Sequence, residues 1–126
     1  MPSLASGPGH GYDAAANLKW SSAEKAIARK AFDQALQREL QAVMTETKER
    51  AVKIQRASDL WDLEHYLTGR RSQIDQQFDY RYSVLIQVFS DLVHGGRLSE
   101  QELQGLDEDK LGLIRHYAAF LVADSC

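Results

Sequence analysis

The longest hydrophobic pattern in the chain lies between Trp20 and Ser58, where apolar residues recur every three or four positions. The stretch contains no Gly or Pro, and charged residues lie around the rest of the predicted helix. The apolar stripe consists of Ile27, Ala31, Leu36, Leu40, Val43, Thr47, Ala51 and Ile54. This period predicts one long amphipathic helix, begun by a capping box between Ser21 and Glu24. About 35 helical residues span roughly 50 Å, so we expect part of the helix to project or to be covered by another chain.

Apolar residues continue at helical spacing after Ser58, with an interruption at Gly69. Ser58 and Asp59 are suited to cap a helix. The apolar positions before the glycine are Leu60, Leu63 and Leu67, and those after it are Ile74, Phe78, Leu85, Phe89 and Leu92. We therefore expect a short helix up to Gly69 and a longer one that ends at the Gly95–Gly96 pair.

The last third of the chain is also predicted to be helical. The run 83–89 has the β-branched character of a strand, but the helical period on either side favours a helix. A second capping box joins Ser99 to Glu102, and the acidic run 107–109 suits the start of a terminal helix. The apolar positions of that helix are Leu111, Ile114, Ala118 and Leu121. The fold class predicted is all-α, with a long N-terminal helix followed by three to four shorter helices in a hairpin arrangement, and we expect an elongated helical homodimer.

Residues 1–19 differ from the rest of the chain. They contain three glycines and both prolines, few large apolar side chains and no hydrophobic period. This composition is typical of a disordered tail. We therefore divide the chain into a tail, residues 1–19, and a single all-helical domain, residues 20–126.

Composition limits the classes of function. The chain has 126 residues, 44% of them hydrophobic and 26% charged, which is typical of a globular domain. It has no apolar run long enough for a membrane span and one cysteine, the terminal Cys126, so we expect a cytoplasmic protein without disulfides. Residues 19–56 hold nine basic and five acidic residues, but these alternate in sign without a recognition motif, which argues against nucleic-acid binding.

Catalytic and metal-binding patterns are missing from the sequence. The four histidines have no zinc-ligand spacing, and the acidic run 107–109 lacks the glycine and glutamate of a calcium loop. There is no nucleophile elbow and no Gly-rich phosphate loop. We therefore expect a binding protein that is not an enzyme and has no cofactor.

Trp61 and Arg71 are the strongest candidates for a binding surface. Trp61 lies beside Leu60 and widens the apolar face of its helix, which suits a dimer anchor or, alternatively, a core residue. Arg71 is spaced to pair with Asp75, and Asp79 could extend the pair into a network with nearby arginines. Such a network is either a solvated face or part of a subunit interface, where removing one partner is costly.

The second half of the chain resembles the fluorescence recovery protein family of cyanobacteria. The residues that carry the resemblance are Asp59-Leu60-Trp61-x-Leu63, Leu67, Arg71, Ile74-Asp75, Phe78-Asp79, Arg81, Ser83-Val84, Ile86, Val88-Phe89, Leu92-Val93 and Gly96. Upstream, the resemblance extends through Trp20-Ser21, Ala31-Phe32 and Arg38-Glu39-Leu40, so that it covers about three-quarters of the chain.

The resemblance implies a homodimer without a cofactor. Such a protein binds the photoactivated orange carotenoid protein, through that partner's C-terminal domain, and detaches it from the phycobilisome. It also speeds the return of the partner from the red to the orange form, which ends photoprotective quenching. By position, the resemblance assigns the dimer interface to Leu60, Trp61, Glu64, His65 and Arg71, and the partner-binding surface to Gln87, Phe89 and Leu113.

Four of these positions depart from the family pattern. Family members have His and then Asp where this chain has Glu64 and His65, and a Phe and a Lys where it has Gln87 and Leu113. The second pair changes an aromatic anchor and a charge on the partner-binding surface. The alternative function is therefore a diverged dimeric adaptor with the same scaffold and a different protein partner.

Overall fold

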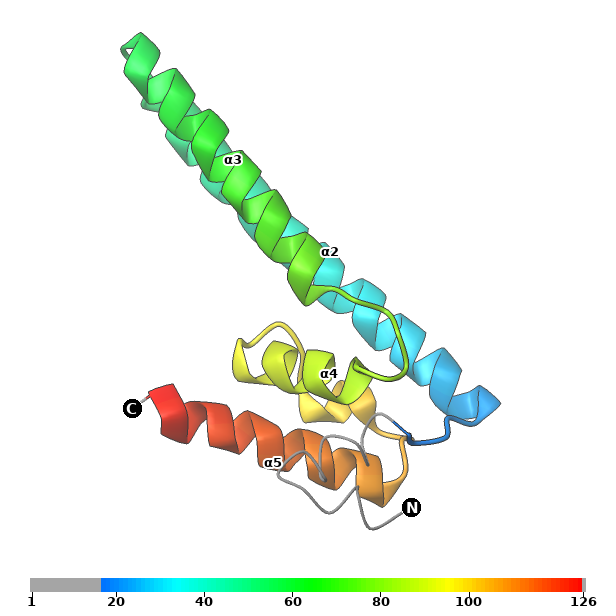
Figure 1. The fold of residues 1–126 in the computed structure, drawn as a ribbon. Coiled ribbons are helices and arrows are strands. Elements are labelled where there is room, and N and C mark those ends of the chain that lie inside the picture. Colours follow the sequence, from blue (N-terminus) through cyan, green and yellow to red (C-terminus); the bar gives the residue numbers. More distant parts are fainter. Residues whose placement is uncertain (1–16, 126) are drawn as a thin grey trace.

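The computed structural model describes residues 17–125, which form four α-helices and one 3-10 helix (Figure 1). In chain order these are α2 (Ser22–Val52), α3 (Ala57–Gln77), α4 (Leu85–His94), the 3-10 helix η2 (Glu100–Leu103) and α5 (Glu108–Ser125). The predicted fold, a long first helix followed by shorter ones, is confirmed. Residues 1–16 and Cys126 lie outside the described residues, so the division into tail and domain stays a prediction.

The start of α2 follows from local sequence. Ser21 Oγ accepts the backbone N–H of Glu24 at 3.1 Å, and Glu24 Oε1 accepts that of Ser21 at 3.0 Å. These two bonds are the predicted capping box, which satisfies two N–H groups that a helix start leaves free. Before it, Leu18 packs against the core and the Lys19 carbonyl accepts a hydrogen bond from Lys110, so residues 18 and 19 contact the folded domain.

The end of α2 differs from the prediction. The helix stops at Val52, so Ile54, which we expected on its apolar stripe, lies in the following turn. Asp59 explains the early stop, because its carboxylate accepts the backbone N–H groups of Gln55 at 3.0 Å and Arg56 at 3.2 Å. This bonding starts α3 at Ala57 and leaves only a short turn between the two helices.

Helix α3 also differs from the prediction, because it continues through Gly69 to Gln77. A glycine inside an exposed helix costs about 1 kcal/mol, which the neighbouring turns tolerate. The break comes instead at residues 78–84. There the rings of Phe78 and Tyr80 pack edge-on against Phe32 of α2, with centroid distances of 5.5 and 4.9 Å. These long-range contacts pull the chain out of helical geometry before α4 begins at Leu85.

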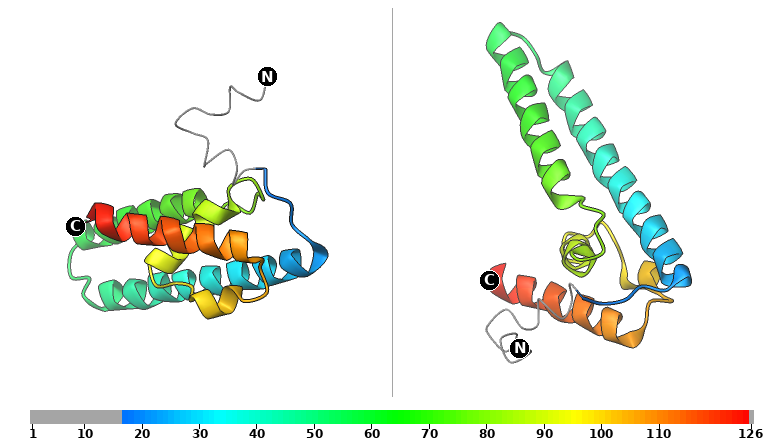
Figure 2. Two further views of the ribbon diagram at one scale, coloured as in Figure 1. Left: turned by 90° about the horizontal axis from the view of Figure 1, so that it is seen from below. Right: turned by 45° about the vertical axis from the view of Figure 1, so that its right-hand side comes forward.

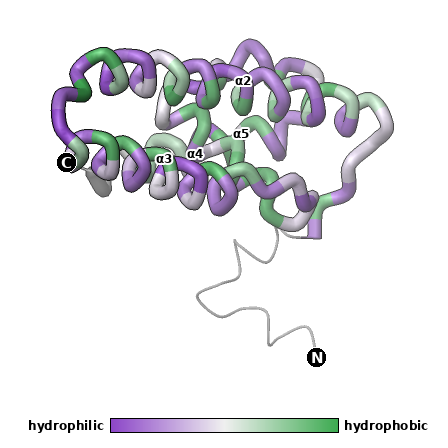
Figure 3. Tube along the Cα trace, turned by 90° about the horizontal axis from the view of Figure 1, so that it is seen from above, coloured by the Kyte–Doolittle hydropathy of each residue, from purple (hydrophilic) through white to green (hydrophobic). Residues whose placement is uncertain are grey.

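The molecule has two parts, which we call the arm and the head. The arm comprises residues 40–77, in which the second half of α2 and the whole of α3 run side by side in opposite directions (Figure 2). The head comprises residues 17–39 and 78–125. Every buried residue among those described belongs to the head, and α3 has none. The arm thus projects from the head with both of its helices largely open to solvent, and polar and apolar positions alternate along them (Figure 3).

The core lies in the head, where α4 and α5 pack against each other and against the first half of α2. Its largest fully buried apolar side chains are Phe89, Leu85, Ile86, Leu92, Leu103 and Ile114. The predicted helix end at Gly95–Gly96 is confirmed, and Gly96 adopts a φ of 78° that favours glycine. The capping box from Ser99 to Glu102 is also confirmed, although it begins the short helix η2.

Candidate functional site

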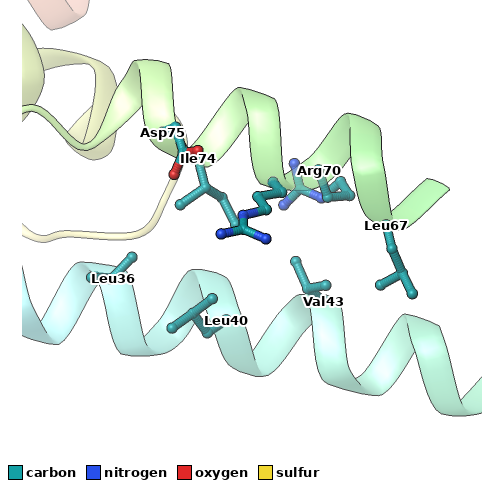
Figure 4. A pocket seen from close by; sticks show the side chains of 8 residues that line it. Leu36, Leu40, Val43, Leu67, Arg70, Ile74 and Asp75 are labelled. Carbon is teal, nitrogen blue, oxygen red and sulfur yellow. The ribbon is translucent and has the colours of Figure 1, made fainter. Parts of the chain in front are cut away.

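An apolar groove of about 500 Å³ runs between the two helices near the base of the arm. Figure 4 shows leucine and valine side chains of α2 facing α3 across it. Its lining residues are Leu36, Leu40 and Val43 of α2 and Leu67, Arg70, Arg71, Ile74 and Asp75 of α3. A groove lined by aliphatic side chains and edged by charged ones is suited to receive an apolar side chain of another protein.

The two arginines of the groove have different surroundings. Arg70 is half-buried and binds Glu39 of α2, and it donates to Gln73 at 2.7 Å. Arg71 is exposed, and within residues 17–125 it forms no hydrogen bond or ion pair. The predicted pair with Asp75 is thus not formed, and Arg70 turns to Glu39 instead of Asp79. An exposed pair within one helix turn contributes only a few tenths of a kcal/mol, which explains why it does not hold.

Exposed apolar side chains accompany the groove along α3. Leu60 is 47% exposed, Trp61 59% and Leu67 39%. A tryptophan with more than half of its surface in water is not part of this chain's core, so the alternative of a core residue is wrong. Large apolar groups in a row on one helix are typical of surfaces that bind other proteins.

Glu64 and His65 lie between these apolar residues, and both are exposed. Glu64 accepts a hydrogen bond from the Thr68 hydroxyl at 2.8 Å. The Nδ1 atom of His65 lies 3.1 Å from the Trp61 carbonyl oxygen and 3.9 Å from a Glu64 oxygen. The five residues predicted for the dimer interface are therefore all on the solvent-facing surface of α3, where a second protein can reach them.

The residues predicted for partner binding lie on α4 and α5 in the head. Gln87 is half-buried and donates to Asp91 at 3.1 Å. Leu113 is half-buried and packs against the edge of the core. Phe89 is 0% exposed and lies inside the core, so the surface proposed below does not include it.

The structure adds Phe120 to this surface. It is 63% exposed and follows Leu113 and Tyr117 at helical spacing on α5, so the three form one apolar strip. The sequence carried a signal for it, because Phe120 lies seven residues after Leu113, on the same side of a helix. The apolar period that predicts the terminal helix marks its core-facing residues and leaves Phe120 out.

Metal-ligand side chains do not cluster in the described part of the chain. No three His, Cys, Asp or Glu side chains in residues 17–125 are placed to hold a metal ion together. None of the helices in that range has the length and apolar character that a membrane crossing would need. A projecting hairpin with an apolar groove thus places the molecule in the class of all-helical proteins whose candidate sites are protein-binding surfaces.

Comparison with known proteins identifies the family. Residues 20–118 match the family described as photoprotection regulator fluorescence recovery protein. The chain belongs to this family, and the resemblance found in its sequence is confirmed.

Relatives of known sequence and structure agree with this assignment. The fluorescence recovery protein of Synechocystis sp. (strain ATCC 27184 / PCC 6803 / Kazusa) is 37% identical over 103 residues, which are 82% of this chain and 94% of the relative. The structure of the Fremyella diplosiphon fluorescence recovery protein matches with a TM-score of 0.77 and 40% identity. The structure from Synechocystis sp. PCC 6803 matches with a TM-score of 0.77 and 37% identity, and each match covers 80% of this chain and 99% of the other.

Proposed function

We propose that this protein is a non-enzymatic regulator that binds the photoactivated orange carotenoid protein. Binding detaches that partner from the phycobilisome and speeds its red-to-orange reversion, which ends photoprotective quenching. The observation that carries the proposal is membership of a family of photoprotection regulators over residues 20–118. The exposed apolar surfaces of the arm and the head support a mechanism that works through protein contacts, without a cofactor.

The arm is the proposed dimer interface. Its two halves along α3 have complementary character: the first carries the projecting Trp61 and the acidic Glu64, and the second carries the groove and the unpaired Arg71. In an interface with twofold symmetry each copy offers both halves to the other. A second copy of this chain, packed antiparallel along α3, therefore places each half of α3 against the complementary half of the other copy.

A specific register follows from this complementarity. If the twofold axis crosses α3 between Leu67 and Thr68, Trp61 of one copy lies opposite Ile74 of the other, at the groove. The same register places Glu64 opposite the second copy's Arg71, which gives that guanidinium the carboxylate it lacks among residues 17–125 of its own chain. Desolvated Arg–carboxylate pairs of this kind fix the register of an interface more than they add to its affinity.

The head is the proposed surface for the orange carotenoid protein, with the C-terminal domain of that protein as its contact. The surface includes Gln87, Leu113 and the strip that continues to Phe120. Because the resemblance expects Phe and Lys in place of the first two, the aromatic contribution in this chain comes from α5. The second candidate function, a dimeric adaptor with another protein partner, is favoured by the same two departures.

The testing experiment mixes this protein with photoactivated orange carotenoid protein and follows the red-to-orange recovery in the dark by absorbance. We expect substoichiometric amounts to accelerate the recovery, and we expect the two proteins to co-elute. Phe120→Ala should reduce both effects, whereas Val52→Ala, which truncates an 82% exposed residue at the arm tip, should reduce neither. A recovery rate that stays unchanged, together with separate elution, would reject this partner in favour of the adaptor.

A further inference from the structure

Glu39 marks the boundary between the head and the arm. It is the last buried residue of α2, with 6% of its surface exposed, and the later residues of the helix are all partly or fully exposed. A carboxylate at such a position must be paired, because an isolated buried charge is strongly unfavourable.

The two oxygens of Glu39 bind arginines from different parts of the molecule. Oε1 accepts from Nε of Arg97, at 2.7 Å, in the loop between α4 and η2. Oε2 accepts from Nη2 of Arg70 on α3. One carboxylate therefore joins the head loop to the arm through α2.

The neighbours of Glu39 on α2 divide between the same two parts. Arg38 donates to the Arg97 carbonyl at 2.9 Å and binds Glu102 with both ends of its guanidinium, at 2.8 and 2.5 Å. Leu40 faces the arm groove (Figure 4). Of three consecutive residues, Arg38 thus contacts the head, Glu39 contacts both the head loop and the arm, and Leu40 contacts the arm.

At the base of the arm, the ring of Phe78, directly after the end of α3, packs on Phe32 of α2. Where the last turns of α3 approach α4 and α5, an open groove of about 510 Å³ separates them. Its lining includes Gln73, Gln76 and Gln77 on the arm side and Asp91 and His94 on the head side. Because this groove is open, the position of α3 relative to the head depends on the Phe78 contact and on the charged cluster at Glu39.

We propose that Glu39 is a positioning residue that couples the arm groove to the loop of residues 95–99 in the head. Arg70 lines the groove, so a side chain that enters the groove presses on a guanidinium held by Glu39, and the same carboxylate holds Arg97. The order of the head loop then depends on the state of α3. The coupling lies within one chain and does not need a dimer. One consequence rests on the proposed function, namely that dimer formation orders the partner-binding head.

Hydrogen exchange of individual amides tests the coupling. The reporters are the Phe78 N–H, bonded to Ile74 at the end of α3, and the Arg97 N–H, bonded to Leu92 in the head loop. Glu39→Gln keeps the side-chain size but removes the charge, and we expect both amides to exchange about tenfold faster or more. Glu46→Gln is the matched control, because Glu46 is also on α2 but its ion pair is with Arg50 of the same helix.

Arg70→Gln gives the decisive comparison, because the hydrogen bonds of Arg70 go to Gln73 and Glu39 and, among the described residues, not to the head loop. Faster exchange at Arg97 in this variant supports the coupling, and an effect confined to α3 overturns it. If Glu39→Gln does not fold, Arg70→Gln and Arg97→Gln provide the test. We expect Arg70→Gln to speed exchange of the Arg97 amide, and Arg97→Gln to speed exchange of the Phe78 amide. Sedimentation of every variant reports the dimer separately, so a failure of the proposed dimer is not mistaken for a failure of the coupling.

Discussion

The ammonium group of Lys110 lies 3.2 Å from Glu24 Oε2, with only 1% of the lysine side chain exposed. The pair joins the first turn of α5 to the first turn of α2. Lys110 also donates to the Lys19 carbonyl at 2.7 Å, and its Nζ lies 4.9 Å from the centre of the Trp20 ring. Glu24 in turn accepts the backbone N–H of Asp107 at 2.9 Å. One buried ion pair thus fixes three segments of the head to one another.

Lys110→Met should lower the free energy of unfolding by about 3 kcal/mol, because it leaves Glu24 buried without its cation. Methionine fills most of the same space, so the loss reports the charge and not a cavity. Urea unfolding followed by circular dichroism measures it. The control is Lys30→Met, at an exposed position of α2, which should change stability by less than about 0.5 kcal/mol. Equal effects of the two substitutions would show that the buried pair does not stabilise the head.

The stability of the head should depend on pH through Glu102. Hydrogen bonding from Arg38 lowers the pKa of Glu102 to about 2, from an ordinary value of 4.5. The ionised form is therefore favoured by folding, so its contribution is complete above pH 4.5 and disappears as the pH falls toward 2. Glu102→Gln should lower stability at pH 7 and have little effect near pH 2, as measured by urea unfolding across this range. Glu49→Gln, at an exposed position, should give a curve parallel to the parent, and a parallel curve for Glu102→Gln would contradict the prediction.

Gly105 cannot be replaced without cost. Its φ of 107° is unfavourable for other residues, and an added Cβ would lie 2.3 Å from Cδ1 of Ile27. Gly105→Ala should therefore destabilise the protein by about 2 kcal/mol. Gly112→Ala provides the comparison, because this helical glycine has no heavy atom within 4 Å of an added Cβ. It should be neutral or stabilise by up to about 1 kcal/mol in thermal unfolding, so a similar loss in both variants would reject this explanation.

The proposed register of the dimer predicts a charge-reversal result. Glu64→Arg and Arg71→Glu should each raise the dimer dissociation constant about tenfold or more, because each places like charges opposite each other. The double variant should recover most of the affinity, since the pair is restored with opposite polarity. Sedimentation equilibrium measures all three. Additive losses in the double variant would exclude this register while leaving other dimers open.

Trp61 should contribute more to the dimer than other exposed apolar residues. Trp61→Ala removes a large aromatic side chain from the proposed interface and should raise the dissociation constant at least about tenfold. Val52→Ala is the control, because Val52 lies at the arm tip, outside the groove and the proposed register. Circular dichroism should show unchanged helix content in both. A dimer of unchanged affinity in Trp61→Ala would place the interface elsewhere.

The elements that the sequence predicted correctly are those set by neighbouring residues. The capping boxes at Ser21 and Ser99 each need a partner only three residues away, and Gly96 ends α4 by its own conformation. The all-α class followed from the apolar period, and the family followed from the residues that carry the resemblance. Of the candidate site, the sequence singled out Trp61 and Arg71. A tryptophan beside an apolar stripe, and an arginine spaced to pair with Asp75, can both be recognised from the sequence alone.

Tertiary structure decided what depends on residues far apart in the chain. Helix α3 continues through Gly69 and breaks at residue 78 because aromatic rings there pack on Phe32 of α2. The exposure of Trp61, and the burial of Phe89, depend on which helix faces are covered in the folded chain. Glu39 shows the same limit most clearly, since its partners lie 31 and 58 residues away. Helical period and capping act over three or four residues, whereas the pairing of a buried charge depends on which segments the fold brings together, and only the structure contains that information.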